Sequence, residues 1–258
     1  MKATTYLNIV VLKQEDKSIL IRTDVHDNQD GDEGETKMVK QGVGIVLGVC
    51  SGNVQRSPTF EAVTNYELTN RHIDTFKADS AGSNVAKILA NKAPQRNMVN
   101  ALNAALHYGV VRAEIKTQVE HIVDQYDGLD RQAAGQELDV MNIVYAELRP
   151  VVHGMIVAYR NLALAQAHIP EVHIPSMYQA FVVDDSTKLV LAMDGKVLDA
   201  VRKELGTRSI KSMLYGGLVE QEPLEDDLKS GLEGAVKQVS YFMDTRKKAV
   251  EEMRQLVA

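Results

Sequence analysis

A cysteine and an arginine, Cys50 and Arg56, enclose a five-residue stretch whose length is typical of an oxyanion-binding loop. The stretch follows an apolar run, residues 44–49, that predicts a buried strand, and it precedes a helical pattern from about residue 58. A loop between a strand and a helix N-terminus can turn its backbone N–H groups inward, where the helix dipole also favours negative charge. The planar guanidinium of Arg56 would hold two oxygens of such an anion.

The cysteine in this loop is expected to act as a nucleophile. Cys50 would lie below the anion, where the loop N–H groups, the helix dipole and Arg56 all favour thiolate over thiol. A thiolate under a phosphate monoester is placed for in-line attack on phosphorus. A lone cysteine is more often a small buried apolar side chain, but Gly52 and Asn53 add the backbone freedom that a tight anion loop needs.

The residues around the cysteine complete the predicted loop. Ser57 suits the N-cap of the following helix, and Pro58 suits its first turn, where a missing N–H costs nothing. The residues expected to bind the substrate phosphate are Ser51, Gly52, Asn53, Val54 and Gln55.

The segment from Val49 to Pro58 resembles the phosphate loop of the low-molecular-weight protein tyrosine phosphatases, which related arsenate reductases share. Three further segments are similar to parts of the family in the same order. These are residues 79–83, after its second strand, residues 94–110, a helix, and residues 189–194, its third strand and the Met-Asp that ends it. The resemblance covers roughly residues 44–126 and 180–257.

The resemblance implies an α/β fold: a doubly wound, four-stranded parallel sheet with helices on both faces and the phosphate loop at the carboxyl end of a central strand. It also implies roles for the loop residues. Cys50 would form a cysteinyl-phosphate, and Arg56 with the loop N–H groups would stabilise the equatorial oxygens. Ser57 would donate a hydrogen bond to the sulfur, and Asn53 would hold the loop in shape.

The general acid is expected in the stretch from Leu218 to Asp227, because the family carries an Asp-Pro pair there. This chain has no Asp-Pro in that stretch, and Glu222-Pro223 is the nearest equivalent. Glu222 is therefore the predicted acid, with Asp226 and Asp227 as alternatives. All three could instead only stabilise the start of the last helix, where negative charge is favourable.

Two parts of the chain fall outside the resemblance. Residues 1–40 are predicted to be an extension, with strands at 6–12 and 18–22 joined as a β-hairpin and an acidic loop over 24–35. Residues 41–258 are predicted to be one phosphatase-like domain that contains a helical insertion at about 127–178.

The insertion carries an apolar stripe at helical spacing. Its members are Met141, Val144, Tyr145, Leu148, Val152, Met155, Tyr159, Leu162 and Gln166. The stripe could cover the phosphatase core, form a cap over the active site, or make a homodimer surface. A similar stripe in the last helix, about 227–257, favours packing of the two helices together.

The composition and the net charge indicate which partners, cofactors and compartment to expect. The net charge of −6 without a basic patch argues against nucleic acid as a partner. A single cysteine excludes internal disulfides, and no signal-peptide core or membrane-length apolar run is present, so a cytoplasmic protein is expected. The seven histidines form no metal signature, and no Gly-rich dinucleotide loop occurs, so neither a metal nor a cofactor is expected.

Three functions remain open on the sequence. The first is hydrolysis of a phosphomonoester, on a protein or a small molecule, through a cysteinyl-phosphate. The second is arsenate reduction with an external thiol, since one cysteine cannot run an internal disulfide relay. The third is a non-catalytic phosphate-binding or scaffold protein. The aromatic residues that line the family's pocket are missing after Ser83 and after Pro223, which favours a small or non-aromatic substrate.

Overall fold

The structure is a computed structural model, and it describes residues 10–14, 17–21, 43–127, 131–223 and 228–257. The chain divides into two units, residues 1–41 and 42–258. In the first unit, strand β1 (Val10–Gln14) pairs antiparallel with β2 (Lys17–Ile21), with Gln14 opposite Lys17. The predicted hairpin is therefore present, whereas the acidic segment 24–35 lies outside the described residues.

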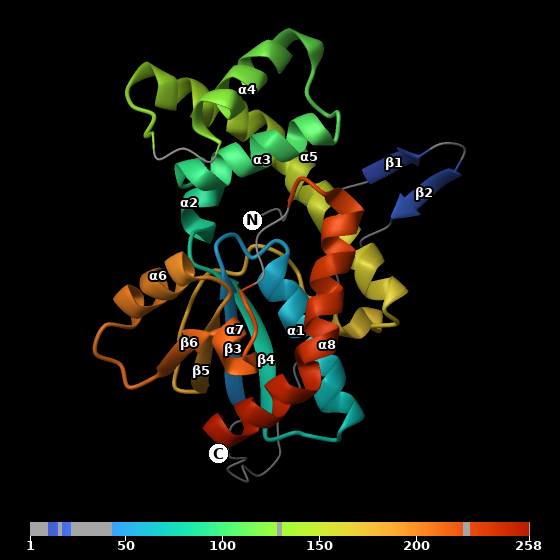
Figure 1. Ribbon diagram of the computed structural model, residues 1–258, viewed down its shortest axis with the longest axis vertical. Coiled ribbons are helices and arrows are strands. Elements are labelled where there is room, and N and C mark those ends of the chain that lie inside the picture. Colours follow the sequence, from blue (N-terminus) through green and yellow to red (C-terminus); the bar gives the residue numbers. More distant parts are fainter. Residues whose placement is uncertain (1–9, 15–16, 22–42, 128–130, 224–227, 258) are drawn as a thin grey trace, which may run out of the picture. The chain divides into compact units, whose positions relative to one another are not determined.

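A four-stranded parallel sheet forms the centre of the second unit, in the order β4-β3-β5-β6 (Figure 1). The strands are β3 (Gly44–Cys50), β4 (Phe76–Gly82), β5 (Thr187–Ala192) and β6 (Lys211–Leu214). This confirms the predicted fold class. Strand β3 has a neighbour on each side, so the loop after Cys50 leaves the sheet at a central strand.

Helices cover both faces of the sheet because successive side chains of a strand point to opposite faces. Val46 packs in one core with helices α1 (Arg56–Asn70) and α8 (Gly231–Val257). Leu47 and Val49 pack in another with α6 (Gly195–Leu205). Between β6 and α8 lies the short helix α7 (Tyr215–Val219).

Strand β4 ends later than the sequence predicts. Residues 79–83 are expected to follow the second strand, but the observed strand runs to Gly82. The pairing with β3 explains this, since the register runs from Gly44 opposite Phe76 to Cys50 opposite Gly82. A residue larger than glycine does not fit at Gly82 without a shift of its neighbours, because a Cβ there would lie 2.8 Å from the Asn53 nitrogen.

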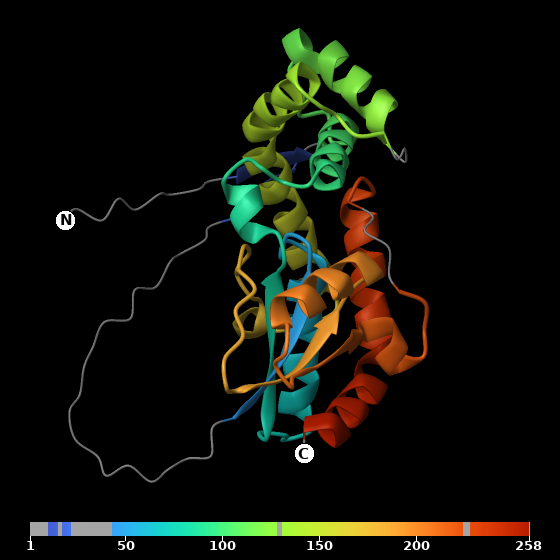
Figure 2. The ribbon, with the colours of Figure 1, turned by 90° about the vertical axis from the view of Figure 1, so that its left-hand side faces the viewer.

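A helical lobe lies beyond the carboxyl ends of the strands (Figure 2). Its elements are α2 (Val85–Leu89), α3 (Gln95–His107), α4 (Ala113–Tyr126) and the first part of α5 (Gln136–Gln166). The predicted insertion is thus mainly one 31-residue helix, followed by a short 3-10 turn at Glu171–His173. The lobe has its own apolar core, and Val54 of the predicted phosphate loop belongs to it.

The apolar stripe of α5 is mostly buried within the chain. Met141, Val144, Tyr145, Leu148, Val152 and Met155 are buried, Tyr159 is half-buried and Leu162 is exposed. The first part of α5 packs against α3, and α5 also packs along α8, as the two stripes predicted. None of the helices in the described part of the chain has the length and apolar run that a bilayer span requires.

Candidate active site

The sulfur of Cys50 receives two hydrogen bonds at the end of β3. The Ser57 hydroxyl lies 3.0 Å from Sγ, and the Asn53 backbone N–H donates to it over 3.2 Å. The thiol is the only cysteine in the chain, and the residue is 4% exposed. Both donors therefore converge on the atom that the sequence predicts to be the nucleophile.

Asn53 is the residue that fixes the shape of the loop. Its backbone adopts the left-handed conformation, with φ 52°. The sequence predicts such backbone freedom for both Gly52 and Asn53. Its side-chain amide donates to the Ser80 hydroxyl over 2.9 Å and accepts from the Gln179 backbone N–H over 2.7 Å. The Tyr178 N–H bonds the Asn53 carbonyl, so the left-handed residue is held from several sides.

Ser57 is not the N-cap that the sequence predicted. The helix α1 begins at Arg56 with Gln55 at the N-cap, and Ser57 lies in the first turn. Its hydroxyl is instead within hydrogen-bond distance of the Cys50 sulfur and of the Ala81 carbonyl, at 3.1 Å. A tertiary contact has therefore overridden the capping preference, and it places the hydroxyl where the family resemblance implies.

Arg56 is anchored to the neighbouring strand-to-helix turn. Its guanidinium makes a 3.0 Å ion pair with Asp194, which also caps α6 by accepting from the Val197 N–H over 2.9 Å. Burial alone would raise the pKa of Asp194, but the charge of Arg56 and the Val197 N–H hold it below its usual range. The Asp194 carboxylate thus holds one side of the Arg56 guanidinium in position.

The loop borders a narrow pocket whose opposite wall comes from the helical lobe. Cys50, Gly52, Val54, Gln55 and Arg56 line one side of it. The other side is lined by Ile88, Asn97, Asn100, Tyr145, His153, Ile156 and Leu228. The cavity of about 40 Å³ has room for an ion of a few oxygens. The inserted helix α5 therefore acts as a wall of the site as well as part of the core.

Sequence reasoning missed the α5 and α3 residues of this pocket. Tyr145 belongs to the predicted apolar stripe, but a stripe identifies a buried face and not the surface that it faces. The Tyr145 hydroxyl has no hydrogen-bond partner among the described residues, and neither has the side-chain oxygen of Gln55.

The buried His153 and the half-buried Tyr178 form a pair at the edge of the pocket. Nδ1 of His153 and the Tyr178 hydroxyl are 2.5 Å apart. Burial, with the charge of Arg149, lowers the pKa of His153 to about 4, and burial raises the pKa of Tyr178 to about 12. Both side chains are therefore neutral near pH 7, with the hydroxyl as donor and Nδ1 as acceptor.

A second arginine, Arg160 of α5, holds the loop from behind. Its guanidinium donates to the Val54 carbonyl over 3.1 Å and to the Pro175 carbonyl over 2.9 Å. The side chain is fully buried, and this burial lowers the pKa of Arg160 to about 10, against the opposing effects of Glu61 and Cys50. Arg160 remains charged at neutral pH, so a fixed cation lies under the phosphate loop.

Ser51 connects the loop to the lobe. Its hydroxyl accepts from the side-chain amides of Asn97, over 2.9 Å, and Asn84, over 3.0 Å. The backbone of the loop is tied to the same region, since the Ser83 and Asn84 N–H groups donate to the carbonyls of Cys50 and Ser51. Ser51 therefore positions the loop, and its side chain is already occupied by these neighbours.

The structure does not bring Glu222 to the pocket wall. Its side chain is exposed, and its carbonyl accepts a hydrogen bond of 3.1 Å from the Tyr241 hydroxyl. The alternatives Asp226 and Asp227 lie outside the described residues. Leu228, six residues after Glu222, does line the pocket.

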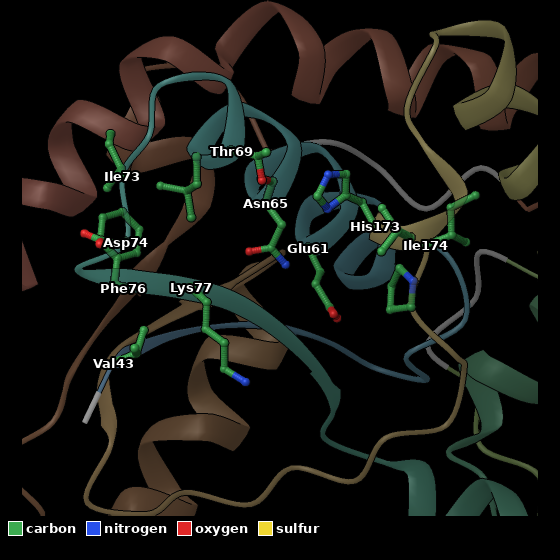
Figure 3. A pocket seen from close by; sticks show the side chains of 13 residues that line it. Val43, Glu61, Asn65, Thr69, Ile73, Asp74, Phe76, Lys77, His173 and Ile174 are labelled. Atoms are coloured by element: carbon green, nitrogen blue, oxygen red, sulfur yellow. The ribbon is translucent and has the colours of Figure 1, made fainter. Parts of the chain in front are cut away.

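A second, wider pocket of about 380 Å³ lies between α1, β4 and the segment after α5, and does not include Cys50 (Figure 3). Glu61, Lys77 and His173 are among the residues that line it. One carboxylate oxygen of Glu61 is buried without a partner among the described residues. Burial, aided by Asp79, raises the pKa of Glu61 to about 7, despite the opposing effects of Ser80 and Arg160.

Several solved structures align with most of the chain at low sequence identity. A low molecular weight protein tyrosine phosphatase from T. tengcongensis is 17% identical, with 81% of this chain and 99% of that chain covered and a TM-score of 0.47. A protein tyrosine phosphatase from Entamoeba histolytica is 14% identical, with coverages of 82% and 97% and a TM-score of 0.48. An arginine phosphatase from Geobacillus stearothermophilus is 15% identical, with coverages of 82% and 94% and a TM-score of 0.45.

The family comparison covers the part of the chain that contains the phosphate loop. No curated protein matches the chain. Residues 45–129 match the family model described as low molecular weight phosphotyrosine protein phosphatase. The match includes β3, the loop, α1 and β4, and it stops before α5. Over residues 45–129, therefore, the chain is similar in sequence to the low molecular weight phosphotyrosine protein phosphatases, as its phosphate loop predicts.

Proposed function

We propose that this protein hydrolyses phosphomonoesters through a cysteinyl-phosphate intermediate. The observation that carries the proposal is the arrangement around one sulfur: Cys50 accepts from Ser57 and Asn53 in a pocket that Arg56 also lines. This arrangement supports an oxyanion site with a nucleophile at its base.

In the first step, Sγ of Cys50 attacks phosphorus and the bond from phosphorus to the leaving oxygen breaks. Arg56 and the loop N–H groups stabilise the equatorial oxygens, where charge lies in the transition state. The ion pair with Asp194 keeps the guanidinium oriented, so little reorganisation is needed when the anion binds.

In the second step, water attacks phosphorus and the bond to sulfur breaks, which releases phosphate and the thiolate. The Ser57 hydroxyl donates to that sulfur, which makes it a better leaving group. Glu222 is the proposed acid that protonates the leaving oxygen and then takes a proton from the water. For this role the exposed Glu222 carboxylate must move toward the pocket as substrate binds.

The decisive experiment replaces the nucleophile. Cys50→Ser should abolish turnover of p-nitrophenyl phosphate and still bind inorganic phosphate, because a serine hydroxyl is not ionised at neutral pH and the rest of the loop is intact. Calorimetric titration with phosphate and a phosphate-release assay measure the two effects. Wild-type turnover by the variant would eliminate the covalent route.

Arg56→Lys tests the anion site in the same assays. Most activity should be lost, because a point charge cannot replace a fork that holds two oxygens. An active Arg56→Lys enzyme would show that the phosphoryl group does not lie against the guanidinium.

Binding without catalysis is a second candidate function, favoured by the position of Glu222 away from the pocket. A protein that binds phosphate but releases none from any phosphorylated peptide, sugar or nucleotide would support it. Arsenate reduction is not favoured, since the matching family model is that of a phosphatase.

The proposal also covers the class of substrate, the cellular compartment and the oligomeric state. We expect a small or non-aromatic phosphomonoester, and the cytoplasm stays the proposed compartment. A homodimer through the inserted helix also stays a proposal. Since the stripe is covered within the chain, such a dimer would use the exposed Ile143 and Val151 of α5, and sedimentation of Ile143→Glu tests it.

A further inference from the structure

The Tyr145 hydroxyl is a buried polar group that lacks a partner. The residue is 0% exposed, and its hydroxyl has no hydrogen-bond partner among the described residues. An unsatisfied buried polar group costs free energy, and native structures contain few of them. Since Tyr145 lines the pocket of Cys50 and Arg56, a bound ligand can supply the partner.

The surroundings of Tyr145 hold it in place. Its ring packs edge-on against His153 with 6.5 Å between ring centroids, and His153 is itself bonded to Tyr178. About four turns beyond Tyr145 on α5, the helix is tied to the loop by the bond from Arg160 to the Val54 carbonyl. The distance between the hydroxyl and the loop is therefore fixed by packing at both ends.

The chemistry of the pocket determines what the hydroxyl can bind. Burial, with a smaller effect of Tyr178, raises the pKa of Tyr145, so the hydroxyl keeps its proton and can donate it to a hydrogen bond. The opposite wall carries Arg56 and Cys50, which select a ligand rich in acceptor oxygens. A tetrahedral oxyanion meets both conditions within a cavity of about 40 Å³.

We propose that the Tyr145 hydroxyl donates a hydrogen bond to an oxygen of the phosphoryl group bound over Cys50. This inference rests on the proposed function, because it takes the phosphoryl group as the ligand of the loop. It makes the inserted helix part of the substrate site. The family model ends before this helix, so Tyr145 is a contact specific to the inserted segment.

The test is Tyr145→Phe, which keeps the ring and removes only the hydroxyl. Titration with inorganic phosphate should show affinity reduced by about 10-fold or more, as expected for a lost hydrogen bond to a charged group. The melting temperature without phosphate should stay the same or rise, since an unsatisfied buried hydroxyl has been removed. Tyr145→Leu, which also removes the hydroxyl, serves as a second variant if Tyr145→Phe does not fold.

Tyr215→Phe is the matched control. Tyr215 is also buried, but its hydroxyl is 2.7 Å from the Thr245 hydroxyl and it does not line the pocket. This variant should melt at a lower temperature and bind phosphate like the wild type. A lower melting temperature in Tyr215→Phe but not in Tyr145→Phe, with weaker phosphate binding only in Tyr145→Phe, separates a ligand contact from a structural role.

The outcomes distinguish this inference from the proposed function. Wild-type phosphate affinity in folded Tyr145→Phe, with hydrolysis intact, overturns the inference alone. Weakened phosphate binding in that variant, with no hydrolysis by the wild type, supports the inference and removes the proposed reaction. A wild-type protein that neither binds phosphate nor hydrolyses esters overturns both.

Discussion

Arg160 donates a hydrogen bond of 3.1 Å to the carbonyl of Val54, a residue 106 positions away in the chain. The same guanidinium reaches the Pro175 carbonyl, so one buried side chain joins the inserted helix, the phosphate loop and the segment after the helix. The family's loop is thus supported in this chain by a residue outside the matched segment.

Arg160→Lys should lower stability and activity together. The ammonium keeps the charge but cannot donate to two carbonyls in the geometry of the guanidinium, which leaves one of them unpaired at a cost of about 1–2 kcal/mol. At roughly 2–4 °C for each kcal/mol, the melting temperature should fall measurably. The kcat for p-nitrophenyl phosphate should fall as well, because the loop loses a support. Arg112→Lys, at an exposed pair with Glu147, is the control that should change neither.

Glu61→Gln should stabilise the protein at high pH. The pKa of Glu61 is raised from 4.5 to about 7, so folding favours its neutral form. The native state then binds more protons than the unfolded state, and stability contributed by this group is lost as pH rises from about 4.5 to 7. Glutamine avoids the loss, which is roughly 3 kcal/mol at most. Urea unfolding at pH 4.5 and pH 8 measures it, and an equal effect of the mutation at both values would refute the raised pKa.

His153→Gln should stabilise the protein at acidic pH. The pKa of His153 is lowered from 6.5 to about 4, so the unfolded state binds the proton more tightly. Stability contributed by this group is present above pH 6.5 and lost as pH falls toward 4. Since glutamine does not titrate, the variant should lose less stability than the wild type between pH 6.5 and 4. Parallel pH profiles of the two proteins would contradict this.

Glu222→Gln should slow the hydrolysis of alkyl phosphates by roughly 10²–10⁴, the usual contribution of a general acid. It should slow p-nitrophenyl phosphate much less, because that leaving group hardly needs a proton. Steady-state kinetics on both substrates provide the comparison. Equal, small effects would reject Glu222, and the same measurement on Asp226→Asn and Asp227→Asn would then examine the alternatives.

The phosphate loop was predictable because its signals are local. Residues 44–58 show an apolar run, then Cys50 and Arg56 at a spacing that few other structures need, and then a helix. The end of β4 was not predictable, since it depends on pairing with β3 as far as Gly82. The position of Ser57 was also wrong for a non-local reason: the Cys50 sulfur and Ala81 carbonyl, which are distant in sequence, occupy its hydroxyl.

The wall of the pocket opposite the loop could not be found from the sequence. The period of the α5 stripe marks Tyr145 as buried, and it carries no information about which element covers it. His153 and Arg160 lie beside the stripe. Their roles in the site depend on the hydroxyl and carbonyl groups that the fold places within hydrogen-bond distance of them. Polar residues in a largely apolar helix are therefore the signal that could have indicated a site.

Helix α5 belongs to two cores, through Tyr145 in the lobe and through Leu164 against the sheet. Opening of the lobe must then disturb the wall of the phosphate pocket. By thermodynamic linkage, an anion that binds the closed arrangement makes opening less favourable by the same free energy. The backbone amides of α3 and α4, whose buried side chains pack in the core of the lobe, would exchange with solvent more slowly when phosphate occupies the loop.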